Sequence, residues 1–178
     1  MEQLNPEVLV HVLQTATRDV FATMLGTEVV CGEPHQETVP PNPTEGVVSL
    51  IGLAGNWVGT GAVACSAPLA CKLSSLMLMS QAESVNEEVL DVVAELTNMI
   101  IGNVKTGLEE TLGPMGLSVP TVVFGKNFTT RSIADGQWTV CPFEVEGGTL
   151  EVKICLTPNR RPVLQARPGF PHTYSLQG

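Results

Sequence analysis

The sequence has few positive charges, and this shortage limits the partners that the protein can bind. Its 9 Lys and Arg residues stand against 18 Asp and Glu residues, which gives a formal net charge of -9. A surface of this sign repels nucleic acid phosphates and anionic lipid headgroups. Arginines come close together only near the C-terminus, at Arg160, Arg161 and Arg167. We therefore expect neither a nucleic acid nor a membrane surface as a partner.

The sequence also lacks long apolar runs and paired cysteines. No window holds the ~18 uncharged apolar residues that a membrane-spanning helix needs. The N-terminal residues have neither the basic start nor the apolar stretch of a secretion signal. The 5 cysteines include no C-x-x-C pair, and most lie in apolar runs, where a thiol packs as a small hydrophobic group. These absences predict a cytoplasmic protein with reduced cysteines.

Common motifs of hydrolases that carry their own catalytic apparatus are missing as well. The sequence has no G-x-S-x-G elbow, no H-E-x-x-H zinc motif and no Walker loop. Its histidines, His11, His35 and His172, lie far apart in the sequence, and each is best explained as an ordinary surface or packing residue. The chain therefore offers no evident nucleophile or phosphate cradle of its own, and we expect no bound metal.

The residues that are present fall into helical and strand-like patterns. Segments with helical apolar spacing and a capping residue in front cover about residues 6–25, 66–79 and 86–112. Shorter β-rich segments cover about residues 27–31, 46–53, 57–65, 118–124, 137–145 and 149–156. Gly55-Asn56 and Glu146-Gly147-Gly148 predict two hairpin turns.

This order of elements predicts an α+β fold with two layers, in which long helices pack on a largely antiparallel sheet. A chain of 178 residues fits a single domain, which we expect to cover residues 1–156. Residues 157–178 are rich in Pro, Arg and Gly, and this composition predicts an extended or disordered C-terminal tail.

The predicted helix 86–112 has an apolar and a polar side. With about 100° per residue, its apolar side holds Val89, Val93, Leu96, Ile100 and Val104. The opposite side carries four residues that we call the polar stripe: Asp91, Glu95, Asn98 and Gly102. Surface helices commonly have a solvated polar side, but Gly102 in mid-helix costs about 1 kcal/mol relative to Ala. A glycine also lets another backbone come close, so we interpret the stripe as a docking surface.

Asp91, Glu95, Asn98 and Pro120 also match a known spacing. The pattern is an Asp or Ser, three residues, Glu, two residues, Asn, twenty-one residues and Pro, and the segments DVVAELTNMIIGN and SVPTVVFG carry it here. It resembles the active-site pattern of the CheC/CheX family of chemotaxis phosphatases. The hairpin segment VSLIGLAGNWVGTGAVACS, which precedes the two later helices, fits the same family. Two-site members carry a second E-x-x-N on the first helix, where LVHVLQTATRDVF has none, so the chain resembles the single-site CheX type.

The resemblance implies hydrolysis of the aspartyl phosphate on a CheY-like response regulator receiver domain, in chemotaxis or two-component signalling. By this resemblance, Asn98 would position the attacking water and Glu95 would pair with a lysine of the receiver. Asp91 and Gly102 would support docking, and Pro120 would set the loop beside the helix. The protein itself would need no cofactor, because the receiver domain would supply the Mg²⁺.

Two other interpretations remain open. A non-catalytic adaptor would bind a receiver domain through the same helix without hydrolysing its phosphate. A dimeric structural subunit is the second alternative, because an exposed sheet edge is a template for a second copy. CheX relatives form dimers by joining sheets, so we expect a homodimer through sheet edges, which is compatible with all three interpretations.

Overall fold

The computed structural model describes residues 4–38, 45–126, 128 and 137–159. Residues 160–178, which make up most of the predicted tail, lie outside the described residues. Within these described ranges, no helix is long and apolar enough to cross a membrane.

Three helices form where the sequence predicts them. They are α1 (Pro6–Val20), α2 (Ala67–Leu78) and α3 (Glu87–Leu112), and a π-helical turn (Phe21–Leu25) extends the first of them. Each begins after a residue whose side-chain oxygen accepts a backbone N–H of the first turn, namely Asn5, Ser66 and Asn86.

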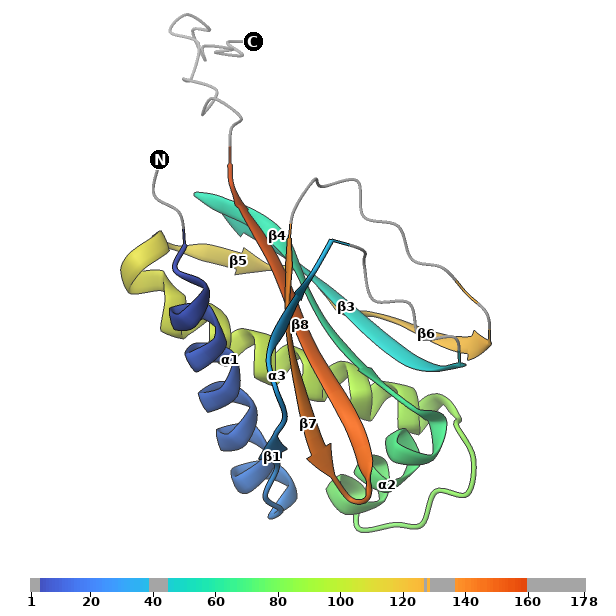
Figure 1. Cartoon of the computed structure of the whole chain (residues 1–178). Helices are drawn as coiled ribbons and strands as arrows, with labels where there is room; N and C mark the ends of the chain where they lie inside the picture. The colour runs from blue at the N-terminus through green and yellow to red at the C-terminus, as the bar shows by residue number, and fades with distance from the viewer. Residues whose placement is uncertain (1–3, 39–44, 127, 129–136, 160–178) are drawn as a thin grey trace, which may run out of the picture.

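The strands form one sheet in the order β1-β7-β8-β4-β3-β5, and every pairing is antiparallel (Figure 1). Its centre consists of the long strands β3 (Glu45–Gly55), β4 (Trp57–Cys65), β7 (Trp138–Val145) and β8 (Gly148–Pro158). The edges are shorter: β1 (Val30–Cys31) and β2 (His35–Glu37) pair with β7, while β5 (Met115–Leu117) and β6 (Thr121–Lys126) pair with β3.

Both predicted hairpins are present. β3 turns into β4 at Asn56, and β7 turns into β8 through Glu146 and Gly147. These two residues have φ values of 51° and 73°, as a two-residue type I′ turn requires.

The helices cover one face of the sheet, so the predicted two-layer α+β fold is confirmed (Figure 1). Helix α3 lies in the middle of the helical layer and packs against α1, α2, β3 and β4. The core between the layers contains fully buried residues from both, such as Phe21, Ile51, Leu96, Ile100, Phe143 and Ile154.

The strand predicted over about residues 118–124 is confirmed only from Thr121 onward, because residues 118–120 are not part of a strand. Leu53 pairs with Leu117 and Leu50 pairs with Thr121, so three residues of the β5–β6 connection lie opposite two residues of β3. The extra residue makes a β-bulge at residues 118–120, which separates β5 from β6. Pro120 cannot donate a hydrogen bond to β3, so it is tolerated at a bulge but not within a regular ladder.

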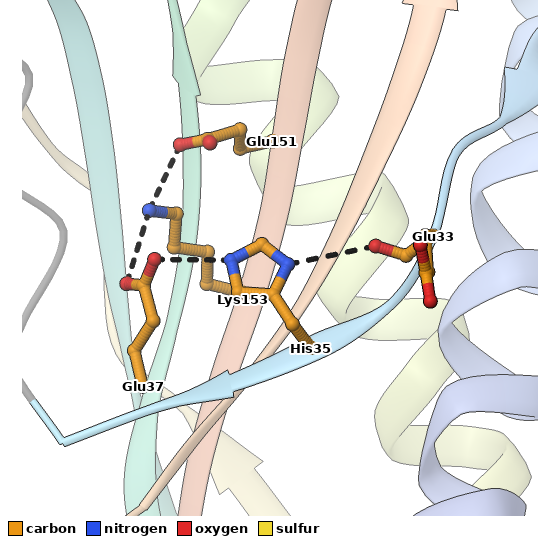
Figure 2. A network of polar contacts seen from close by, with 5 residues as sticks. All are labelled: Glu33, His35, Glu37, Glu151 and Lys153. Atoms are coloured by element: carbon orange, nitrogen blue, oxygen red, sulfur yellow. Dashed lines mark hydrogen bonds and ion pairs between the residues drawn. The ribbon is translucent and has the colours of Figure 1, made fainter.

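The face of the sheet away from the helices carries a buried lysine with partners from two strands (Figure 2). Lys153 is only 4% exposed, and its Nζ lies 2.8 Å from Glu151 Oε2 and 3.7 Å from Glu37 Oε2. The other oxygen of Glu37 lies 3.1 Å from His35 Nε2. Because Glu37 and His35 belong to β2, this network ties the short edge strand to the central strand β8 across β7.

Candidate functional site

Helix α3 presents the polar stripe to solvent. Its core side is buried through Val93, Ile100 and Val104, which fixes the rotation of the helix on the sheet. Asp91, Glu95 and Asn98 therefore lie on the outer side and are exposed, as the helical periodicity predicts.

The side chains of the stripe are free to engage a partner. Within the part of the chain that the structure describes, no hydrogen bond or ion pair involves the side chain of Asp91, Glu95 or Asn98. Asn98 follows Glu95 by three positions on a helix of about 5.4 Å pitch, so their polar ends lie about one turn apart. The site is a convex helix surface that offers one carboxylate and one carboxamide side by side.

The C-terminal end of α3 is attached to the sheet edge by Glu109. Its Oε1 accepts hydrogen bonds from Lys105 Nζ at 2.8 Å and from the Met115 N–H at 3.1 Å. These two hydrogen bonds lower the pKa of the Glu109 carboxyl group, and the one from Lys105 has the larger effect. The sequence places Glu109 on the polar side of the helix but gives no signal that it holds the start of β5.

Gly102 is half-buried where α3 passes β5. A Cβ atom at this position would meet only Leu117 Cδ1, at an ordinary contact distance of 3.9 Å. The packing of this chain therefore does not require glycine at position 102. The space beside Gly102 is compatible with a docking partner, and the docking role of Gly102 stays a prediction.

Pro120 lies in the bulge between β5 and β6. Both strands pack against α3, so the bulge flanks the helix on the side of the sheet edge. Three of the four motif positions thus lie on the exposed side of α3, and the fourth lies in the bulge between two strands that pack against this helix.

The cysteines do not provide an alternative nucleophile. The spacing C-x5-R of cysteine phosphatases does occur once, from Cys155 to Arg161, but Cys155 is a buried residue within strand β8. An extended strand cannot fold around a phosphate, and burial raises the pKa of the Cys155 thiol. Burial likewise raises the pKa of Cys65 and of Cys141 to about 12, which keeps both protonated at neutral pH.

The described residues give little support for a metal site or for a small-molecule pocket at the stripe. Among the described residues, no group of three or more His, Cys, Asp or Glu side chains could hold a metal ion. Two surface hollows lie beside α1, one against α3 and one against β2, and neither is lined by Glu95 or Asn98. The fold and the stripe together define an α+β protein whose candidate site is a helix surface suited to a macromolecular partner.

Comparison with known proteins gives the family. The family described as Chemotaxis phosphatase CheX matches residues 47–144. Among solved structures, a CheC-like superfamily protein from Shewanella sp. PV-4 is similar, with 30% identity, a TM-score of 0.76, and 86% of this chain and 99% of that chain covered. The chemotaxis protein CheX from Vibrio vulnificus has 28% identity and a TM-score of 0.73, with 84% and 99% covered.

A more distant structure is the CheX-CheY-BeF3-Mg²⁺ complex from Borrelia burgdorferi. It has 23% identity and a TM-score of 0.70, covers 83% of this chain and 97% of that chain, and supports the fold alone. A search of curated proteins found no match. The chain therefore belongs to the CheX family of chemotaxis phosphatases, as its motif spacing predicted.

Proposed function

We propose that this protein hydrolyses the aspartyl phosphate of a CheY-like receiver domain, with the polar stripe of α3 as its active surface. The observation that carries the proposal is the exposed pair of Glu95 and Asn98, which no other described side chain engages. Family membership and the CheY in the Borrelia burgdorferi complex support the same partner.

Asn98 positions the attacking water. Its carboxamide has an acceptor oxygen and a donor NH₂ group, so it can accept a hydrogen bond from a water and also donate one to a phosphoryl oxygen. An aspartyl phosphate is already a reactive acyl phosphate, and holding water in line with the breaking P–O bond is enough to accelerate its hydrolysis. Water adds to phosphorus, the aspartate carboxylate leaves, and inorganic phosphate is released.

Glu95 fixes the register of docking. Its carboxylate pairs with the lysine of the receiver that contacts the phosphoryl group, and this pair orients Asn98 toward the phosphorus. The Mg²⁺ stays in the acidic pocket of the receiver, so the phosphatase contributes no metal ligand. Asp91 and Gly102 border the docking surface, and Pro120 holds the bulge that flanks it.

The test follows phosphate loss from a Mg²⁺-bound phosphorylated receiver domain. Wild-type protein should accelerate hydrolysis by tenfold or more, which corresponds to about 1.4 kcal/mol of barrier, and Asn98→Ala and Glu95→Ala should each abolish the acceleration. Asn103→Ala is a matched control, because Asn103 is another exposed asparagine of α3 that lies outside the stripe.

One outcome would replace the catalytic proposal with the adaptor alternative. If the wild-type protein binds the phosphorylated receiver but leaves its rate of decay unchanged, the stripe is a binding surface only. An acceleration that survives in Asn98→Ala would instead contradict the role of the carboxamide.

We also propose that the protein acts in the cytoplasm as a homodimer joined at sheet edges. All 5 cysteines are free, which suits a reducing compartment. The short strands β1, β2, β5 and β6 form the edges of the sheet, where a second copy can add its own strand. Sedimentation equilibrium tests this assembly, and a monomer at micromolar concentration would contradict it.

A further inference from the structure

We propose that Val119, at the bulge between β5 and β6, is an apolar contact for the phosphorylated receiver domain beside Asn98 and sets the affinity of docking. The inference rests on the function proposed above and adds a residue that the motif spacing does not contain. It depends on the exposure of Val119, on how the bulge is fixed, and on where the bulge lies along α3.

Val119 is 85% exposed, although it is a β-branched apolar residue within a sheet edge. Single exposed apolar residues are common on protein surfaces and need no explanation by themselves. Here, however, the exposed residue lies in the bulge, where Val119 and Pro120 together are opposite the single residue Ile51 of β3. Bulges redirect side chains and recur beside functional sites.

The bulge is held firmly by Ser118. The Ser118 N–H donates to the Gly52 carbonyl at 2.9 Å, and the Gly52 N–H donates back to Ser118 Oγ at 2.8 Å. The same hydroxyl donates to the Val119 carbonyl at 3.0 Å. Pro120 further restricts the backbone of Val119 to extended conformations. A side chain on such a fixed backbone loses little conformational freedom when a partner covers it.

Two contacts show that the chain runs back along α3 after the helix ends. The Met115 N–H bonds to Glu109, and two residues later Leu117 lies against Gly102, which is seven residues earlier in the helix. A strand advances about 3.3 Å per residue and a helix about 1.5 Å. Two more residues therefore bring the chain from Leu117 to the level of the helix segment that carries Asn98 and Glu95. We infer that Val119, two residues after Leu117, is at this level.

The position of Val119 indicates which partner would cover it. A receiver domain that brings its phosphoaspartate to Asn98 also comes over the neighbouring bulge, because β5 and β6 pack against α3 and the path of the chain brings the bulge toward the level of Asn98. An apolar side chain there gains from being covered in both the ground state and the transition state. Val119 therefore contributes uniform binding, which lowers KM without changing kcat.

The experiment compares wild-type protein, Val119→Ser and Val30→Ser in the phosphorylated-receiver assay. Val30 is a matched control, since it is also an exposed valine, 67% exposed, on the short strand β1 at the opposite edge of the sheet. Val119→Ser should raise KM at least fivefold and leave kcat within twofold, and Val30→Ser should change neither. Thermal unfolding verifies that all three proteins are folded, and sedimentation gives their assembly state.

Each other outcome is decisive. If wild-type protein is active and Val119→Ser has an unchanged KM, the inference is wrong and the proposed function stands. If Val119→Ser dissociates a dimer, the residue belongs to an interface between copies and the inference is also wrong. If wild-type protein is inactive, the proposed function is wrong, and the inference that rests on it is wrong as well.

Discussion

Gly61 on β4 lies directly beneath Ile101 on α3. A Cβ atom at Gly61 would stand 2.8 Å from Ile101 Cδ1, which is closer than real side chains come. The absence of a side chain at Gly61 thus sets how near the helix approaches the sheet. Ile101 immediately precedes Gly102, so this contact lies next to the polar stripe in the helix.

Gly61→Ala should destabilise the protein by about 1–3 kcal/mol, because an added methyl group overpacks this contact. Denaturant unfolding measures the change in the free energy of unfolding. Gly116→Ala on β5 is a suitable control, since its Cβ would meet only Ala54 O at 3.7 Å. Equal effects of the two substitutions would show that the approach of α3 does not depend on Gly61.

Gly102→Ala should have the opposite effect on stability. A Cβ atom finds room at Gly102, and alanine in mid-helix is favoured over glycine by about 0.5–1 kcal/mol. If a receiver domain approaches the helix at this point, the added methyl group should weaken its binding. Thermal unfolding and receiver binding, measured on the same variant, should therefore move in opposite directions. A variant that is more stable and binds equally well would remove Gly102 from the docking surface.

The network around Lys153 predicts an asymmetric response to substitution. Glu151→Ala leaves the buried ammonium group without its nearest partner and should cost about 1–3 kcal/mol of unfolding free energy. Lys153→Met removes the charge itself and should be neutral or stabilising. Lys126→Met is the control, because Lys126 pairs with Glu45 at 2.8 Å while its side chain is 74% exposed. A large loss in Lys153→Met would contradict this account.

The lowered pKa of Glu109 predicts a pH-dependent contribution to stability. Two hydrogen bonds favour the carboxylate in the folded state, so its folded pKa lies below the ordinary value of 4.5. The stabilisation is therefore complete above about pH 5 and is lost as the pH falls through the folded pKa. Glu109→Gln keeps an acceptor oxygen but cannot ionise, so its stability deficit relative to wild type should shrink between pH 6 and about pH 3. A deficit that is constant over this range would mean that the charge of Glu109 contributes nothing.

Local patterns in the sequence determined the helices, the hairpins and the polar stripe. Residues three and four apart on α3 share a side whatever the rest of the chain does, so burial of Val93 and Ile100 and exposure of Glu95 and Asn98 could be read from the spacing. The motif spacing likewise predicted the family. The chemical roles of Glu95 and Asn98 remain predictions that the phosphorylated-receiver assay tests.

Only the tertiary structure decided how the segments fit across the sheet. The bulge at Val119 exists because the segment from β5 to β6 has one residue more than the part of β3 that it pairs with. This register cannot be predicted from the sequence of either strand alone. The close approach of Gly61 and Ile101 and the burial of Lys153 among carboxylates from β2 and β8 are set in the same way. Helix periodicity depends on near neighbours in the chain, whereas strand register and buried charge pairs depend on residues that folding alone brings together.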